Sequence, residues 1–187
     1  MMRRIGVLLA AFILGPAAAQ GIFDTGVMVK TVMLETDEFE GTMACFQYVA
    51  RVGGNHQGIF AAISSTGLVT LGLTRKTEEP VFMPETWPGD ELRILFPSER
   101  EAVQFDVAHS EAEMNDGLPW REHVFVDITP DFIRRLVAYG SSGNSDFEDD
   151  VYFRFSSHDG AAYDGIIHDD LLKRLQAFVE QCLIGQR

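Results

Sequence analysis

The chain has 187 residues, of which 28 are acidic and 15 are basic, so its formal net charge is −13 at pH 7. Binding to nucleic acid or to anionic lipid headgroups requires Lys and Arg, so this acidity argues against both classes of partner. An acidic surface is typical of a soluble protein, and a basic partner or bound divalent cations are the alternatives that it leaves open.

The N-terminus has the pattern of a cleavable secretory signal. Arg3 and Arg4 precede the apolar residues 5–14, and Ala17-Ala18-Ala19 supplies the cleavage site. The apolar run is about half of the ~20 residues that a membrane-spanning helix needs. A bare arginine pair indicates ordinary secretion better than a twin-arginine signal. We therefore expect residues 1–19 to be removed and residues 20–187 to form a single domain without a transmembrane segment, in the periplasm or outside a bacterial cell.

The chain shows strand signals through most of its length. Four segments alternate apolar with mostly polar residues, which predicts half-buried antiparallel strands: 92–96, 103–107, 124–128 and 151–155. Four less regular candidates precede them: 27–34, 43–51, 58–64 and 68–75. Because short turn sequences separate these early segments, we expect a meander of hairpins in the N-terminal half.

Residues 77–90 form an irregular stretch that contains three prolines and the aromatic residues Phe82 and Trp87. Proline lowers the entropy of the free chain, so this loop can stay ordered and display Trp87. Exposed tryptophan is a favoured contact anchor, which makes Phe82 and Trp87 the candidate interaction surface. The alternative is that both aromatic side chains pack back onto the sheet.

Thr129-Pro130 opens the first predicted helix, with Thr129 as the N-cap and Pro130 at the first helical position. Gly140 ends it. The apolar face of this helix consists of four residues: Phe132, Ile133, Leu136 and Val137.

The loop after this helix, residues 141–150, gathers carboxylates. Asp146, Glu148 and Asp150 are candidate ligands, because Ca²⁺ takes six to eight oxygens. An EF-hand would need a glycine at a place where this loop has none. A solvated acidic hairpin is the simpler interpretation, and we expect no metal.

His158 and His168 each precede an aspartate, and they are the candidates for acid–base or metal chemistry. Neither H-x-x-x-H nor H-E-x-x-H is present, so the simpler interpretation makes them turn and cap residues. The sequence also lacks the G-x-S-x-G motif of a nucleophile elbow and the glycine-rich motifs of nucleotide binding. We therefore expect no catalytic residue and no cofactor.

The last predicted helix begins near Asp169-Asp170, and its apolar residues recur at helical spacing as far as Cys182. The other cysteine, Cys45, lies in a strand-like run. Export would place both where disulfides persist, and neither C-x-x-C spacing nor flanking charge indicates a reactive thiol. The sequence predicts a Cys45–Cys182 disulfide that ties the last helix to an early strand. The fold expected is α+β, with an antiparallel β-rich sheet or sandwich and two helices in the C-terminal half.

Three short segments carry a likeness to a known family: M-A-C-F-Q-Y-V-A at 43–50, D-F-I-R-R-L at 131–136 and L-L-K-R-L-Q-A-F-V-E-Q-C at 171–182. They resemble the invasion-associated locus B family of bacterial exported proteins. Residues 128–182 carry most of the likeness, and the Ser-Pro pair that often follows the first cysteine in that family is absent. The resemblance implies an antiparallel β-rich fold with a disulfide-tied last helix. It implies no catalytic residues, and the family is linked to host-cell interaction in some pathogens.

These observations favour an exported, non-enzymatic protein-interaction or envelope accessory protein whose unidentified protein partner contacts residues 77–90. Two alternatives come from other classes. A β-rich shell with 14 phenylalanines would make a carrier if it enclosed a cavity for a small apolar ligand. An envelope hydrolase would need a nucleophile, a base and oxyanion donors in one cleft.

Overall fold

The computed structural model describes residues 27–36, 43–51, 57–82, 86–97, 99–114, 120–141 and 150–183. The predicted signal, residues 1–19, lies outside the described residues. The elements in chain order are β1 (Val27–Thr36), β2 (Met43–Arg51), β3 (Gln57–Ser64), β4 (Val69–Thr77), β5 (Glu91–Leu95), β6 (Val103–Glu113), β7 (Trp120–Ile128), α1 (Pro130–Ser141), β8 (Val151–Ser156), β9 (Ala162–Ile167), α2 (Asp169–Arg174), α3 (Gln176–Phe178) and the π-helical turn η2 (Val179–Leu183).

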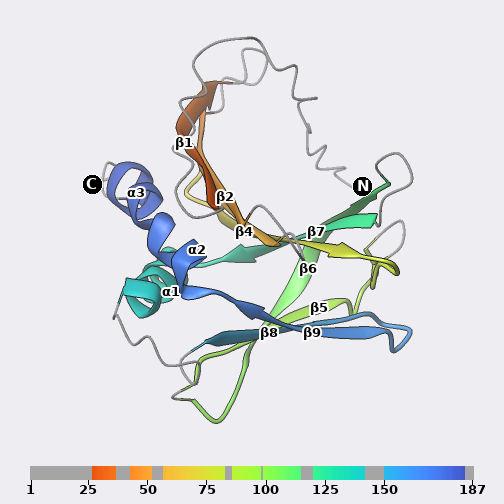
Figure 1. Ribbon diagram of the computed structural model, residues 1–187. Coiled ribbons are helices and arrows are strands. Elements are labelled where there is room, and N and C mark those ends of the chain that lie inside the picture. The colour runs from red at the N-terminus through yellow and green to blue at the C-terminus, as the bar shows by residue number, and fades with distance from the viewer. Residues whose placement is uncertain are drawn as a thin grey trace.

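The first four strands form the antiparallel meander that the turn sequences predict (Figure 1). β4 then pairs with β7, and the described strands make one sheet with the order β1-β2-β3-β4-β7-β6-β5-β8-β9. Side chains alternate between the two faces of a sheet, so partners in register share a face. Val49, Ile59, Leu73 and Val124 are such partners, and each is at most 2% exposed. They belong to the apolar inner face.

β6 bends the sheet. Its residues 103–106 pair with β5, and the strand pairs with β7 from Val107 onward. The register shifts between Val107 and His109, so Ala108 is the extra residue of a β-bulge, which bends a strand. The β5–β8–β9 half therefore curls over the inner face of the meander. The Gln57 side-chain amide, at the start of β3, donates a hydrogen bond to the Ile166 carbonyl of β9.

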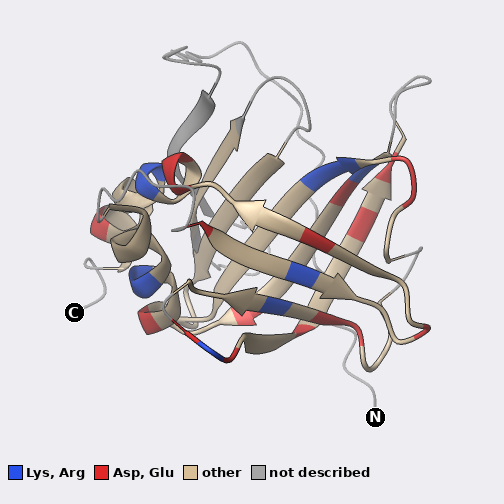
Figure 2. Ribbon diagram, turned by 60° about the horizontal axis from the view of Figure 1, so that its bottom comes forward, with Lys and Arg blue, Asp and Glu red and all other residues tan. Residues whose placement is uncertain are grey.

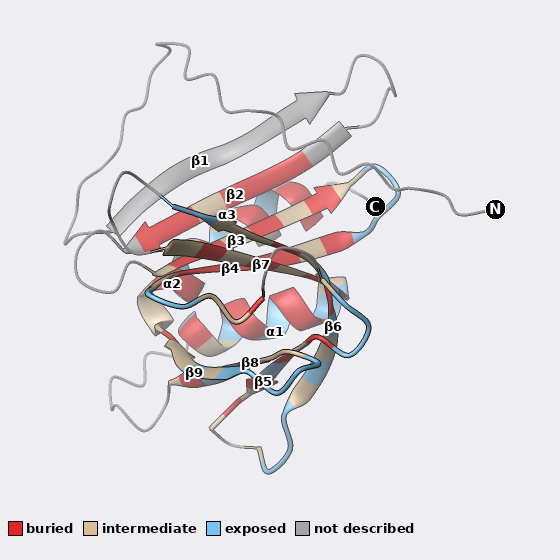
Figure 3. Ribbon diagram, turned by 90° about the vertical axis from the view of Figure 1, so that its right-hand side faces the viewer, coloured by how far each residue is buried: buried red, intermediate tan, exposed pale blue. Residues whose placement is uncertain are grey.

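The helices gather at one end of the curled sheet (Figure 1), and Figure 3 shows α1 between its two halves. α1 begins as predicted, because Thr129 Oγ1 accepts the Phe132 N–H at 3.2 Å and Pro130 is the first helical residue. All four residues of the predicted apolar face are buried. A side chain at Gly140 would collide with Leu172, so this glycine lets α1 and α2 pack closely.

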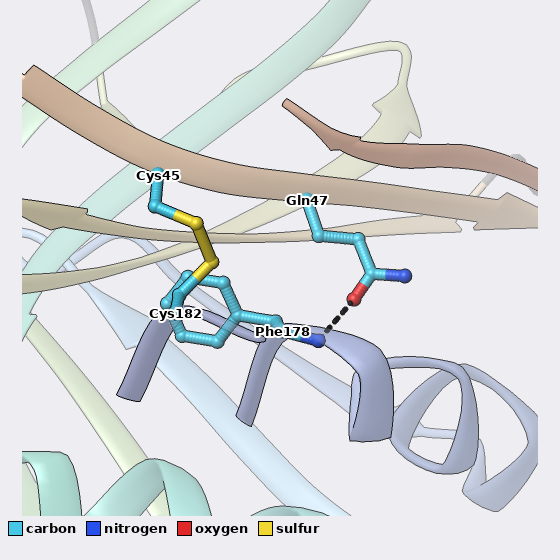
Figure 4. The surroundings of a disulfide bond; sticks show 4 residues. All are labelled: Cys45, Gln47, Phe178 and Cys182. Carbon is cyan, nitrogen blue, oxygen red and sulfur yellow. Dashed lines mark hydrogen bonds between the residues drawn. A yellow bond between two sulfur atoms is a disulfide. The ribbon is translucent and has the colours of Figure 1, made fainter. Parts of the chain in front are cut away.

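The last helix is tied to β2 by the predicted disulfide (Figure 4), in which the Cα atoms of Cys45 and Cys182 lie 5.7 Å apart. The apolar spacing predicts one uninterrupted helix, whereas the structure divides it into α2, α3 and η2. The division has a side-chain cause. Gln47, two residues beyond Cys45, places its side-chain amide between the Arg174 carbonyl and the Phe178 N–H.

Large apolar side chains, among them Phe96, Phe155 and Phe178, are buried in the core. Figure 3 shows buried residues on α1 and on the strands on both sides of it. The α+β class, the antiparallel β-rich sheet and the disulfide-tied last helix are confirmed. β9 was not predicted from alternation, because Gly165 interrupts its pattern where the Phe153 ring fills the space above the strand. Within the described residues, no helix is both long and apolar enough to cross a membrane.

Candidate functional site

Trp87-Pro88-Gly89-Asp90 forms a tight turn that leads into β5. The Asp90 N–H donates to the Trp87 carbonyl at 3.0 Å, and Gly89 has a φ of +101°. A type II turn requires a positive φ at the third position, which favours glycine, and proline is common at the second. Asp90 Oδ2 also accepts the Trp87 N–H at 2.7 Å, so the turn is closed in both directions. The backbone of Trp87 is thereby fixed.

The same aspartate braces the turn against the tip of the β8–β9 hairpin. Asp90 Oδ1 accepts the His158 backbone N–H at 2.8 Å and His158 Nδ1–H at 3.0 Å. The hairpin tip is itself closed by Gly160, which has a φ of +97° and donates to the Ser157 carbonyl at 3.0 Å. Two turns far apart in the sequence are thus held together by one carboxylate that is 2% exposed.

The charge of Asp90 follows from these contacts. Burial acts to raise the pKa of this carboxyl, but the hydrogen bonds from Trp87 and His158 outweigh it and lower the pKa below its ordinary value. Asp90 is therefore ionised at neutral pH and only accepts hydrogen bonds. The proton of a neutral His158 ring must then lie on Nδ1, which leaves Nε2 as an acceptor.

The side chain of Trp87 stays outside the core. It is 53% exposed, and its indole lies against the His158 imidazole with ring centroids 5.7 Å apart. The His158 side chain is itself 43% exposed. We call these two rings the Trp87 surface. Large exposed apolar side chains elsewhere in the described chain include Leu68, Met114 and Tyr152. Trp87 differs from these three because it lies in residues 77–90, the candidate contact loop.

Phe82 is not exposed in this way, so its predicted place in the interaction surface is wrong. It is 2% exposed, and its ring packs 5.7 Å from that of Phe155 inside the core. Each of the two alternatives for residues 77–90 therefore holds for one of the two aromatic residues. Phe82 packs back onto the sheet, whereas Trp87 is displayed.

A buried ion pair anchors the start of this loop. Glu122 Oε2 accepts Arg75 Nε–H at 2.7 Å across β4 and β7, and Glu122 Oε1 accepts the N–H groups of Val81 and Phe82 at 2.7 and 2.9 Å. The Arg75 guanidinium lies 3.8 Å from the centre of the Tyr163 ring on β9. Both charged side chains are buried. The loop is therefore held at both ends, by Glu122 at its start and by Asp90 at its end.

The structure does not bring His158 and His168 together. His158 lies at the hairpin tip before β9, and His168 follows β9 as the N-cap of α2. A six-residue strand separates them, which spans about 20 Å. Asp150 directly precedes β8, while Asp146 and Glu148 lie outside the described residues. Within the described chain, no three His, Cys, Asp or Glu side chains are arranged to hold a metal ion.

A hollow of about 400 Å³ lies at the helical end of the sheet. Its lining includes Ile63 and Leu183, together with Asp131 and Arg134, which form an ion pair at 2.8 Å. It is open to solvent and partly charged. These properties differ from the enclosed apolar cavity that a lipophilic carrier needs.

Sequence reasoning missed the residues that brace the loop. The W-P-G-D tetrapeptide is a type II turn signal that would have placed Asp90 at the fourth position. Glu122 has no comparable local signal, because it binds Arg75 47 residues away. The same holds for Gln47 at the last helix, which binds Arg174 127 residues away.

No model of a known protein family, no curated protein and no solved structure matches this chain. The resemblance to the invasion-associated locus B family stays a prediction.

Proposed function

We propose that this is an exported, non-enzymatic protein-interaction or envelope accessory protein that contacts its partner through the Trp87 surface, in the periplasm or outside a bacterial cell. The observation that carries the proposal is a half-exposed tryptophan on a turn braced by a buried carboxylate. Rigid tryptophans are favoured as contact anchors, because they bring a large area to an interface and lose little conformational entropy on binding.

Two further observations support the proposal. The Cys45–Cys182 disulfide agrees with folding in an oxidising compartment, where such bonds persist. The hydroxyl nearest in sequence to His158, that of Ser157, donates to Asp159 Oδ1 and to the Ala161 carbonyl within its own hairpin. This serine is thus occupied in the turn, which favours a structural role over that of a nucleophile for a hydrolase.

Site-specific photo-crosslinking in the native host tests the contact surface. A photoreactive phenylalanine analogue at position 87 should yield a discrete adduct with one envelope or extracellular protein. The matched control carries the analogue at position 152, because Tyr152 is also exposed, at 43%, but lies at the other end of β8. Identical adducts from both positions, or none from position 87, would contradict the proposal.

Export is tested separately by intact-mass analysis of the protein from its host. The expected species begins at Gln20 and is two mass units lighter than the reduced chain, because one disulfide has formed. A species that retains residues 1–19 would contradict the export part of the proposal.

A further inference from the structure

The end of the sheet that carries Trp87 has an excess of negative charge. Glu78 and Glu79 follow β4, Asp159 lies at the tip between β8 and β9, and all three are exposed. Figure 2 shows acidic residues along the turns at the end of the sheet away from the helices. The arginines of β4 and β8 do not neutralise them, because Arg75 is paired with Glu122 and Arg154 with Asp164.

Asp159 is the acidic residue that adjoins the Trp87 surface in the sequence. It follows His158, whose ring contacts the indole. The Ser157 hydroxyl and the Ala161 N–H both donate to Asp159 Oδ1 and lower the pKa of this carboxyl. Neither of these hydrogen bonds uses Oδ2. The lowered pKa keeps this carboxylate ionised at neutral pH, and it is next in sequence to the ring that contacts the exposed indole.

We infer that the partner places an arginine side chain on this site, with its guanidinium stacked on the Trp87 indole and donating to Asp159 Oδ2. The inference rests on the proposed function and adds the chemistry of the partner. A cation is attracted to the face of an indole, and tryptophan is the best aromatic residue for this contact. Arginine fits better than lysine because its planar guanidinium both stacks on rings and donates to carboxylates in a fixed geometry.

The charge of the whole chain favours the same partner. A protein with a net charge of −13 attracts basic surfaces and repels acidic ones, and this raises the rate of encounter with a basic partner. Binding should therefore weaken as salt screens the attraction, since the screening length falls from about 30 Å at 0.01 M to about 8 Å at 0.15 M.

Calorimetric titration of the purified mature protein with a short blocked glycine–arginine peptide tests the inference. The comparison peptide replaces arginine with citrulline, which keeps the planar shape but has no charge. A Trp120→Phe variant leaves Trp87 as the single tryptophan, so its fluorescence reports binding at this site. We expect the arginine peptide to quench Trp87 and to bind about tenfold more tightly than the citrulline peptide.

Single substitutions test the contributions of Trp87 and Asp159 to peptide binding. Trp87→Ala and Asp159→Asn should each weaken arginine-peptide binding about fivefold. Asp127→Asn, which removes an exposed carboxylate at the end of β7 that leads to α1, should leave it unchanged. If the citrulline peptide binds as tightly as the arginine peptide, and Trp87→Ala weakens its binding, the inference is overturned. The proposed contact surface would then still stand. Binding that Trp87→Ala and Asp159→Asn leave unchanged would also overturn it, while crosslinking from position 87 decides the proposed function independently.

Discussion

The side-chain oxygen of Gln47 on β2 accepts the backbone N–H of Phe178 at 3.1 Å (Figure 4). The Gln47 side-chain NH₂ donates to the Arg174 carbonyl at 2.9 Å. Arg174 and Phe178 are four residues apart, so in an uninterrupted α-helix they would bond directly to one another. The glutamine amide stands in for that bond and lets the chain change from α2 to α3 without leaving buried polar groups unpaired.

Replacing Gln47 with Ala should therefore destabilise the protein by about 1–3 kcal/mol, because the buried Phe178 N–H and the partly buried Arg174 carbonyl lose their partner. Urea unfolding followed by circular dichroism measures the change. Gln176→Ala is the matched control, since the hydrogen bond of the Gln176 side chain to Glu180 is exposed. That control should stay within about 0.5 kcal/mol of the unmodified protein. Equal effects of the two substitutions would show that the Gln47 bridge contributes nothing specific.

Removing the disulfide should have a larger effect. Cys45 and Cys182 are 137 residues apart, and the chain-entropy model gives about 5 kcal/mol for a loop of this length. The Cys45→Ala, Cys182→Ala double variant should lose about 3–5 kcal/mol in urea unfolding. Adding reductant should lower the free energy of unfolding of the unmodified protein to that of the double variant. It should leave the stability of the double variant unchanged. A reductant effect on the double variant would assign the loss to some other cause.

The parts of this fold that the sequence predicted are those with local signals. Alternation located β5, β7 and β8, and the Thr129-Pro130 pair located the start of α1. The disulfide followed from there being two cysteines in a chain expected to be exported. The curl of the sheet was not predicted, because it depends on a bulge at Ala108 that has no sequence signature. Nor was the break in the last helix, because Gln47 causes it from β2.

The candidate site was also predicted only in part from the sequence. The prolines of residues 77–90 left two alternatives, an ordered loop that displays Trp87 or aromatic side chains that pack back onto the sheet. Trp87 is exposed and Phe82 is buried. Periodicity could not separate Trp87 from Phe82, because neither lies in a regular element. Their different environments depend on contacts with β8 and with its hairpin tip, distant segments that only the folded chain brings together.

Glu122→Gln should destabilise the protein by about 3 kcal/mol. The glutamine keeps an oxygen for the N–H groups of Val81 and Phe82, but it leaves the buried Arg75 guanidinium without a counter-charge. Adding Arg75→Met should recover part of the loss, because it removes the unpaired cation. Urea unfolding of the single and double variants measures both effects. A double variant that is less stable than Glu122→Gln alone would rule out the unpaired charge as the cause.

The exposed Asp131–Arg134 pair provides the contrasting control for this experiment. Asp131→Asn should change the free energy of unfolding by less than about 1 kcal/mol, since solvent screens an exposed pair.

Asp90 should make stability depend on acid pH. Its pKa is lowered on folding, so the ionised carboxylate contributes stability that is fully present above the unfolded value, about 3.9, and is lost as the pH falls through the lower folded value. Asp90→Asn should be less stable by about 2 kcal/mol at neutral pH, because an amide cannot replace all three accepted hydrogen bonds. The difference from the unmodified protein should shrink below about pH 4. Urea unfolding between neutral pH and the onset of acid unfolding measures this difference in free energy. The other carboxyl groups are present in both proteins, so their titration cancels in the difference. A constant difference down to the lowest accessible pH would contradict the assignment.

Gly89→Ala tests whether the turn itself sets the position of Trp87. The φ of +101° is unfavourable for a residue with a side chain, so the substitution should destabilise the turn by about 1–2 kcal/mol and loosen the contact between Trp87 and His158. In the Trp120→Phe background, the fluorescence anisotropy of Trp87 should fall and its accessibility to a neutral quencher should rise. Gly67→Ala is the control, because Gly67 has a comparable φ of +82° with open space around it, in the turn between β3 and β4. That variant should show a similar loss of stability with unchanged Trp87 fluorescence. If both variants altered the fluorescence equally, the signal would reflect general destabilisation, and the W-P-G-D turn would have no special role in presenting the indole.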